Sequence, residues 1–296
     1  MLLPKFDYEA PKSLREACAM LEEFGAKAKL LAGGTDLLVN LKKKLLAPQQ
    51  VVSLNKIKGL NEIISKKGKG ISIGPLVTAT LLAESGLVQK QLTVLAQGAG
   101  RLGSPLIRNR ATIGGNIVTA RPASDLAPPL LVLGAQLILK NKDGERELEV
   151  EKFFKGPGKT SIKPKEILSQ IYIPSCEGPC ASAYLKMGAR KALEISLVNV
   201  AVFLELGPEG AIRQARIALG AVGPTPLRAR SAEKILKGGK PRGEGDSLFL
   251  EAAKAAARDG KPIDDHRGSA DYRRALIEIL TVRTLMSAYQ QLMKTA

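Results

Sequence analysis

The sequence predicts an α+β fold, in which a part built from short strands and helices precedes an antiparallel sheet and its helices. Strand-like runs in the first part are short, so no extended parallel sheet is indicated. In the last third, three strand-like runs separated by Gly/Pro turns come before a group of helices. Pro174–Pro179, which holds Ser-Cys-Glu-Gly between two prolines, predicts a domain boundary. The expected units are residues 1–175, with lobes of about 1–55 and 56–175, and residues 176–296.

The composition is that of an ordinary soluble globular protein, with 45% hydrophobic and 25% charged residues over 296 positions. No apolar run approaches the roughly 20 residues that cross a bilayer, so no membrane span is expected. Pro4, Lys5 and Asp7 interrupt the start of the chain, which does not resemble a secretory signal. We therefore expect a cytoplasmic protein.

The net charge of +17 raises nucleic acid as a partner, but the pattern of residues argues against it. Basic residues are scattered over turns, as in Lys42–Lys44, Lys66–Lys69 and Lys237–Lys240. Aromatic residues make up 4% of the chain and Trp is absent, so stacking platforms are lacking. A solvated basic surface or an acidic protein partner is the favoured interpretation.

Cys18, Cys176 and Cys180 are too few for a disulfide framework or a self-contained metal cluster. Metal binding by Cys176 and Cys180 is disfavoured because no His or second cysteine pair lies nearby. The single histidine, His266, excludes a histidine-rich metal centre. No metal site is predicted.

Local signals predict the elements of the first part in order. Residues 13–25 predict a helix that starts with the capping box Ser13-x-x-Glu16 and ends at Gly25. The remaining elements expected here are a strand at Ala28–Ala32, a helix over Leu37–Leu41, a strand at Val51–Leu54, and a hairpin formed by Leu60–Ile64 and Ile71–Ile73.

The rest of the chain is interpreted in the same way. We expect helices at 86–103 and Leu126–Leu133, and strands at Leu137–Lys140, Glu166–Pro174, Ala181–Met187, Val198–Leu206 and Ala215–Val222. Helices are then expected at Ser231–Leu236, at Asp246–Arg258, and from about Ala270 to the end. The apolar face of the last helix is predicted to hold Ala275, Ile279, Val282, Met286, Tyr289 and Met293.

Two short glycine motifs carry the functional signal. The first is Leu31-Ala32-Gly33-Gly34-Thr35-Asp36, and the second is Ala111-Thr112-Ile113-Gly114-Gly115-Asn116 with Asp125 behind it. Paired glycines allow a sharp turn and a close approach of a ligand to the backbone. The exposed N–H groups of such turns accept anions, so two such loops indicate a diphosphate.

Two other glycine patterns are rejected as nucleotide sites. Gly98-x-Gly100-x-x-Gly103 has the dinucleotide spacing, but no clear strand precedes it and Ser104-Pro105 follows it at once. Gly158-Lys159-Thr160 lacks the earlier glycine of a P-loop, since Phe153 stands in that position.

The motifs together resemble those of the FAD-binding subunit of molybdenum hydroxylases, the family of carbon monoxide dehydrogenase and xanthine dehydrogenase. The resemblance covers nearly the whole chain. It is carried by residues 32–36, by Arg108–Asn116, by Pro122–Asp125, by Tyr184-x-Lys186-x-x-x-Arg190, and by the segment from Asp265 to Arg273. It implies a two-lobed FAD-binding domain of the PCMH, or vanillyl-alcohol-oxidase-like, type before a C-terminal domain like that of carbon monoxide dehydrogenase flavoproteins.

The resemblance also implies residue roles. Residues around the first motif would hold the FAD diphosphate, and those around the second would form another anion-binding loop. Asp125 would accept a hydrogen bond from a sugar or ribityl hydroxyl, or alternatively cap the helix after it. Lys186 would reach the cofactor, or alternatively be a surface lysine. Ile195 would lie against the flavin ring, and only Glu194 of Lys191–Glu194 matches the acidic residues of relatives. The implied cofactor-binding residues are Leu30, Leu31, Ala32, Gly33, Gly34, Thr35, Asp36, Leu37, Leu102, Thr112, Ile113, Gly114, Gly115, Asn116, Asp125, Leu168 and Lys186.

The resemblance implies an oxidoreductase subunit without catalytic residues of its own, because the chemistry belongs to the flavin. Its partners would be a molybdenum-cofactor large subunit and a two-iron iron–sulfur small subunit, with NAD or a quinone as external electron acceptor. The shortage of cysteines agrees with clusters held elsewhere. A stand-alone FAD-dependent oxidoreductase and a flavin-free interaction subunit of the same fold remain as alternatives.

Overall fold

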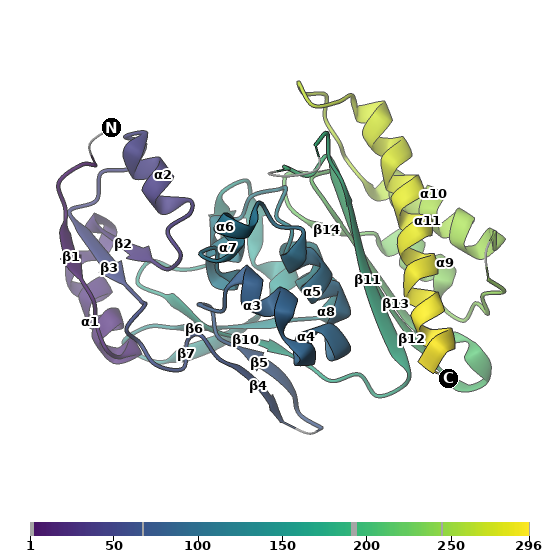
Figure 1. Ribbon diagram of the computed structural model, residues 1–296, viewed down its shortest axis with the longest axis horizontal. Helices are drawn as coiled ribbons and strands as arrows, with labels where there is room; N and C mark the ends of the chain where they lie inside the picture. The colour runs from purple at the N-terminus through teal and green to yellow at the C-terminus, as the bar shows by residue number, and fades with distance from the viewer. Residues whose placement is uncertain (1–2, 67, 191–193, 244, 296) are drawn as a thin grey trace.

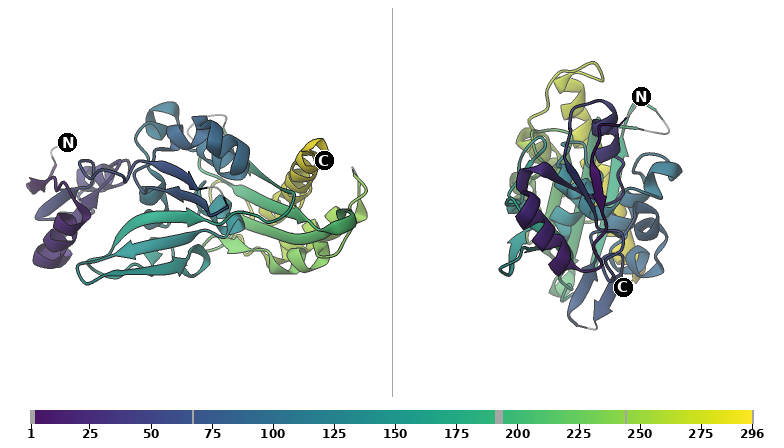
Figure 2. Two further views of the ribbon diagram at one scale, coloured as in Figure 1. Left: turned by 90° about the horizontal axis from the view of Figure 1, so that it is seen from below. Right: turned by 90° about the vertical axis from the view of Figure 1, so that its left-hand side faces the viewer.

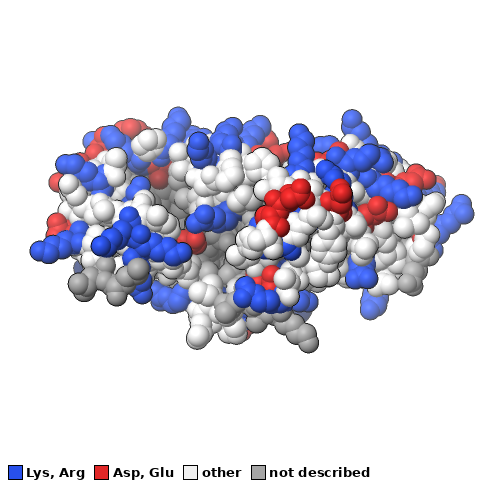
Figure 3. Space-filling view, turned by 90° about the horizontal axis from the view of Figure 1, so that it is seen from above, with Lys and Arg blue, Asp and Glu red and all other residues white. Residues whose placement is uncertain are grey.

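The computed structural model of the chain describes residues 3–66, 68–190, 194–243 and 245–295. The molecule is elongated, with an N-terminal lobe at one end, a central body, and a C-terminal sheet with its helices at the other end (Figure 1). Figure 2 shows the N-terminal lobe standing away from the rest of the molecule. Lys and Arg cover the face in Figure 3 in several separate groups with Asp and Glu between them.

The N-terminal lobe is a small parallel sheet with two helices. The sheet has the order β1-β3-β2 and is formed by Asp7–Glu9, Gln50–Ser53 and Ala28–Leu31. Helix α1 is Leu14–Phe24 and α2 is Leu37–Lys42. The Ser13 side chain caps α1 by accepting a hydrogen bond from the Glu16 N–H, as the capping box predicted. Gly25 ends the helix with a φ of +54°, which confirms the predicted stop.

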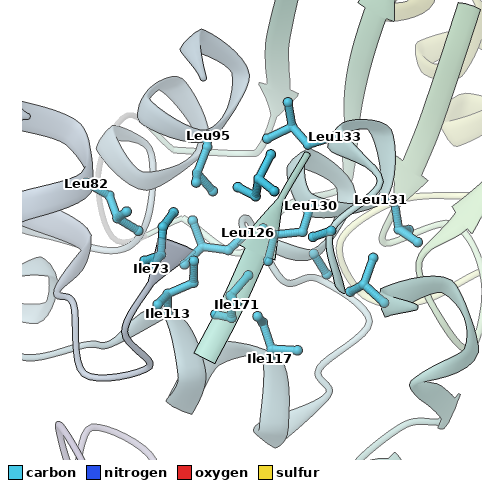
Figure 4. Close-up of a cluster of buried hydrophobic side chains, with 14 of the residues drawn as sticks. Ile73, Leu82, Leu95, Ile113, Ile117, Leu126, Leu130, Leu131, Leu133 and Ile171 are labelled. Carbon is cyan, nitrogen blue, oxygen red and sulfur yellow. The ribbon is translucent and has the colours of Figure 1, made fainter. Parts of the chain in front are cut away.

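The central body pairs an antiparallel sheet with six short helices. The sheet order is β4-β5-β10-β6-β7, formed by Ile63–Lys66, Gly70–Ile73, Ile167–Ile173, Gln136–Lys140 and Glu145–Glu149. The helices are α3 (Ala79–Glu84), α4 (Gly86–Gln91), α5 (Thr93–Gly100), α6 (Pro105–Arg108), α7 (Ile113–Thr119) and α8 (Ala127–Leu133). A small hairpin is made by β8 (Phe154–Gly156) and β9 (Lys159–Thr160). Side chains from the sheet and the helices meet in one buried core (Figure 4).

The single helix expected over residues 86–103 is two helices. Leu92 separates α4 from α5 with φ −132° and ψ 47°, outside the helical region. Its side chain is buried in the central core, so the break directs Leu92 inward and lets both helices pack on the core. Gly98 and Gly100 belong to α5 and follow a helix rather than a strand, which confirms that they are no dinucleotide fingerprint.

The C-terminal part is an antiparallel sheet covered by helices, as predicted. Its order is β11-β12-β13-β14, formed by Cys180–Met187, Val198–Leu206, Ile212–Gly220 and Leu227–Arg228. Three helices follow, α9 (Arg230–Leu236), α10 (Ser247–Asp259) and α11 (Ala270–Thr295). Helix α11 packs against α10, β11 and β12. Every residue of β12 is buried, because helices α5 and α8 of the body also contact this strand.

The predicted apolar face of the last helix is only partly correct, since Met286 and Tyr289 pack against the core but other predicted residues do not. Ile279 is 46% exposed and Met293 is 47% exposed, although both were expected in the core. The buried side of α11 is formed by Leu276, Ile277, Leu280, Thr281, Thr284, Leu285, Ala288 and Leu292. Thr284 is accommodated there because its hydroxyl donates a hydrogen bond to the Leu280 carbonyl at 2.6 Å. Thr281 and Thr284, both buried, made this side look polar in the sequence.

The segment between the body and the C-terminal sheet contains a disulfide that the sequence analysis missed. Cys176 and Cys180 are bonded to each other across the turn that begins β11. The two parts also share packing, because Tyr184 and Phe203 of the C-terminal sheet belong to the central core. Among the described residues, no helix is both long enough and apolar enough to cross a membrane.

Candidate cofactor site

The first glycine motif is the loop between β2 and α2. Gly34 has a φ of +78°, a conformation that L-residues with a side chain rarely adopt. In the part of the chain that the structure describes, no hydrogen bond uses the backbone N–H groups of Ala32–Asp36. This row of unused donors is what a bound anion requires, so the loop is suited to a diphosphate.

Gly33 holds the N-terminal lobe against the central body. A Cβ at Gly33 would collide with the carbonyl oxygen of Arg110, directly before the second motif. Only glycine permits this approach, so the first glycine of the first motif is needed for packing between the lobes. Its backbone contact brings the two motifs together on the walls of one cleft.

The second motif is not a loop but the start of helix α7. Thr112 caps the helix by accepting a hydrogen bond from the Gly115 N–H at 3.1 Å. The N–H groups of Ile113 and Gly114 donate to the Val77 and Pro75 carbonyls, both at 2.9 Å. The prediction of a second anion-binding loop is therefore wrong, because these donors are already used within the chain.

A cavity of about 320 Å³ lies between the two motifs. Twelve of the predicted residues line it: Leu30, Ala32, Gly34, Thr35, Asp36, Leu37, Leu102, Thr112, Gly114, Gly115, Asn116 and Leu168. Leu31, Gly33 and Ile113 do not line it, and Ile113 is fully buried in the core. Sequence reasoning missed the other lining residues, which are Leu54, Pro75, Leu76, Ile107, Ala111, Val118, Thr119, Ile162 and Ile167. Most of these are apolar side chains, spread over turns, helices and one strand, and they belong to no recognisable motif.

A second cavity of about 860 Å³ continues from the first toward the C-terminal domain. Asp36 and Asn116 line both cavities, and Asp36 lies 3.9 Å from Arg121 on the opposite wall. Ile195 borders this second cavity with 55% of its surface exposed, so a ligand can reach it. Together the cavities form a cleft that runs from the N-terminal lobe to the C-terminal domain.

Asp125 and Lys186 form a buried ion pair. The Lys186 ammonium lies 2.9 Å and 3.0 Å from the two carboxylate oxygens of Asp125, and both side chains are less than a tenth exposed. The hydroxyls of Tyr184 and Ser196 also donate to Asp125 Oδ1, at 2.7 Å and 3.1 Å. Burial raises the pKa of Asp125, while Lys186, Tyr184 and Ser196 act in the opposite direction.

The structure rules out the surface position considered for Lys186 and the helix cap considered for Asp125. Lys186 is no surface lysine, because its ammonium also donates to the carbonyls of Arg101 and Glu194. Asp125 does not cap α8, since the Ser124 hydroxyl accepts the N–H bonds of Leu126 and Ala127. Asp125 borders the second cavity and Lys186 lines neither cavity.

The pair joins the cleft wall to the first strand of the C-terminal sheet, which makes it a positioning element. Glu194 borders the second cavity, and its Oε1 accepts the Ala189 N–H at 2.9 Å. Lys191, Ala192 and Leu193, the positions at which the resemblance implies acidic residues, lie outside the described residues.

The cleft fits the flavin dinucleotide that the sequence motifs imply. The unused N–H groups of Ala32–Asp36 suit a diphosphate, and Gly34 and Gly115 leave space beside it. Among the described residues no Lys or Arg lines the first cavity, so backbone dipoles rather than side-chain cations would face the phosphates. The apolar side chains of Leu54, Leu76, Leu102, Val118 and Leu168 form a wall suited to a flat ring system.

Comparison with known proteins agrees with this chemistry. The family model described as the FAD binding domain in molybdopterin dehydrogenase matches residues 4–176, and that of the CO dehydrogenase flavoprotein C-terminal domain matches residues 183–288. The chain is 33% identical to the carbon monoxide dehydrogenase medium chain of Hydrogenophaga pseudoflava, over 98% of this chain and 99% of that one. It is 31% identical to the xanthine dehydrogenase FAD-binding subunit of Escherichia coli O157:H7, over 95% of each chain.

Solved structures show the same fold. A structure of the carbon monoxide dehydrogenase from Hydrogenophaga pseudoflava that lacks the Mo-pyranopterin moiety matches with a TM-score of 0.91 and 34% identity, over 98% of this chain and 99% of that chain. Quinoline 2-oxidoreductase from Pseudomonas putida 86 matches with a TM-score of 0.90 and 30% identity, over 99% of this chain and all of that chain.

The fold and the cleft define a flavin-binding oxidoreductase subunit. More particularly, the chain belongs to the family of FAD-binding medium subunits of molybdenum hydroxylases. Its cofactor is FAD, as the sequence motifs predicted.

Proposed function

We propose that this chain is the electron-transfer subunit of a heteromeric molybdenum hydroxylase. Electrons from a molybdenum large subunit would arrive through an iron–sulfur small subunit and leave to an external acceptor such as NAD or a quinone. The observation that carries the proposal is the cleft, which presents the unused amides of Ala32–Asp36 beside an apolar wall. The medium-chain names of the relatives support the complex.

The residues of this chain would bind and orient the cofactor rather than react. FAD, when bound, supplies the acceptance and release of electrons. Ala32–Asp36 would hold the diphosphate, with the Thr35 hydroxyl as a further donor, and Leu102 and Leu168 would exclude water from the ring system. The Asp125–Lys186 pair would keep the C-terminal sheet fixed against the cleft wall.

The chain would divide this work between two domains. We place the FAD-binding domain at residues 1–175, with lobes of about 1–55 and 56–175, and the C-terminal domain at 176–296. The two family models, which meet near residues 176–183, support this division. We further propose that the complex works in the cytoplasm.

The test is purification of the native protein under conditions that preserve complexes, with flavin, molybdenum and iron measured on the same fractions. We expect the three to elute together with this chain and two further subunits. If the chain elutes alone and its flavin is reduced directly by an organic substrate, the stand-alone oxidoreductase is correct. If the chain is colourless and cannot be reconstituted with FAD, the flavin-free interaction subunit is correct.

A further inference from the structure

The largest cavity of the molecule lies away from the cofactor cleft. It is a groove of about 1280 Å³ between the central body and the C-terminal sheet, and it shares no lining residue with either cavity of the cleft. Ser65, Gly68 and Gly70 of the β4–β5 hairpin, residues of α9 and the disulfide segment form its walls. Pro174 and the Cys176–Cys180 disulfide contribute exposed apolar surface, above the buried side chains of Leu92, Leu133, Ile173 and Phe203. The groove therefore needs a ligand of its own to explain it.

Strand register concentrates polar groups on the sheet face that lines this groove. Phe203 of β12 is paired directly with Arg216 of β13, and Glu205 is paired with Gln214. All four residues line the groove, because alternate residues of a strand share a face. Arg228 of β14 is paired with Ala218, which places it diagonally next to Arg216.

The groove carries more positive than negative charge. Seven of its lining residues are Lys or Arg, and three are Glu. All three glutamates form ion pairs within the groove: Glu177 and Glu205 pair with Arg213, and Glu233 pairs with Arg228. Arg230 pairs with Glu151 at the edge of the groove. Within the described ranges, no carboxylate forms an ion pair with the remaining four cations, which are Lys90, Arg216, Lys234 and Lys237.

Arg216 is the central cation of the groove. Its guanidinium lies 5.5 Å from the centre of the Phe203 ring and donates to the Val132 carbonyl at 3.2 Å, so its position is fixed. Burial lowers the pKa of Arg216 and the neighbouring charge of Arg228 lowers it further, while the charges of Glu233 and Glu205 act in the opposite direction. A half-buried guanidinium without a carboxylate partner, next to a second guanidinium, is an arrangement that an anion stabilises.

Helix α9 supplies further cations on the same side. Arg230 and Lys234 lie one turn apart on α9, Lys237 is the residue that ends the helix, and all three line the groove. Lys234 and Lys237 are exposed at the rim, while Arg216 lies on the floor. A ligand with several negative charges can therefore contact the floor and the rim together.

We propose that this groove binds a small polyvalent oxyanion with an apolar part, of the class of nucleoside diphosphates and triphosphates. The phosphates occupy the space between Arg216, Lys234 and Lys237, and the base lies on the apolar surface formed by Pro174 and the Cys176–Cys180 disulfide. Because both domains form the groove, the bound ligand also stabilises their mutual arrangement.

The test is isothermal titration calorimetry on the full chain saturated with FAD, with ATP and inorganic pyrophosphate as probes. We expect both probes to bind at one site and ATP to bind more tightly. Arg216→Gln weakens both by about tenfold or more, the loss expected when a hydrogen bond between charged partners is removed. The double variant Lys234→Gln/Lys237→Gln, which changes only exposed side chains, also weakens both. Lys254→Gln on α10, an exposed lysine outside the groove, binds as the parent does.

Several results contradict the proposal. It is wrong if neither probe saturates the protein at millimolar concentration, or if Arg216→Gln and the double variant bind as tightly as the parent. If Lys254→Gln weakens the binding of both probes equally, the probes bind to general surface charge rather than to a defined site. Pyrophosphate binding without ATP binding refutes the nucleotide class. Because the groove and the cleft share no residue, none of these results depends on the flavin subunit proposal.

Discussion

Substitution of Gly115 by valine tests the cofactor cleft most directly. A Cβ at Gly115 would lie 3.0 Å from the Thr112 hydroxyl oxygen, which must shift by a few tenths of an ångström. The rest of the side chain would extend into the cavity. Gly115 has no positive φ, and valine has a better helix propensity than glycine. The flavin-free variant should therefore fold with nearly unchanged stability, while FAD loses the space it needs.

The expected size of the effect follows from ligand linkage. At a free FAD concentration of 100 times its dissociation constant, binding stabilises the folded parent protein by about 2.7 kcal/mol. For a chain of this size, roughly 2 °C of melting temperature corresponds to 1 kcal/mol, so FAD should raise the parent's melting temperature by about 5 °C. In Gly115→Val the same FAD concentration should produce almost no shift.

The assay is thermal denaturation with and without FAD, together with flavin absorbance after gel filtration. Gly100→Val is the matched control, since Gly100 ends α5 at an exposed position whose Cβ would meet only Ala83 at 3.8 Å. The control should keep both the shift and the yellow colour. If Gly115→Val retains stoichiometric flavin and the full shift, the cavity between the motifs is not the flavin site.

Two further predictions concern charges that support the cleft. Lys186→Met leaves Asp125 buried without a cation and should lower the free energy of unfolding by about 3–5 kcal/mol, whereas Lys186→Met/Asp125→Asn should recover part of the loss; urea denaturation measures both. Arg267 and Arg273 lower the pKa of Asp265 below its ordinary 3.8. The ionised carboxylate therefore stabilises the folded protein above pH 3.8, and this stabilisation is lost as the pH falls through the lower pKa of the folded state. Asp265→Asn should therefore destabilise the protein at pH 7, and the difference from the parent should shrink toward pH 3; a constant difference would contradict the assignment.

The sequence predicted the elements whose signals are local. Ser13 and Gly25 bound α1 because a cap depends on only a few neighbouring residues. The β11–β13 strands were found because each alternates or clusters apolar residues between clear turns. The first glycine motif was interpreted correctly as a loop because its glycines follow a strand directly.

Features that depend on distant residues were not predicted. The amides of Ile113 and Gly114 are used by carbonyls at Val77 and Pro75, and no local pattern shows that pairing. The pairing of Asp125 with Lys186 joins residues 61 positions apart, so each was assigned a separate role. Arg216 lies beside Phe203 because the register of β12 and β13 pairs the two residues. The sequence alone therefore did not predict the basic groove.

The two glycine pairs nevertheless follow one physical rule. In each pair the first glycine is needed for packing, since a Cβ at Gly33 would meet the Arg110 backbone and one at Gly114 would lie 2.6 Å from Pro75. The second glycine, Gly34 or Gly115, lines the cavity. The first glycine of each pair thus closes a contact that forms the cleft, whereas Gly34 is required by its φ of +78° and Gly115 leaves room in the cavity. Alanine at Gly33 should separate the lobe from the body, whereas a side chain at Gly115 should only fill the cleft, so the two positions distinguish assembly of the site from occupation of it.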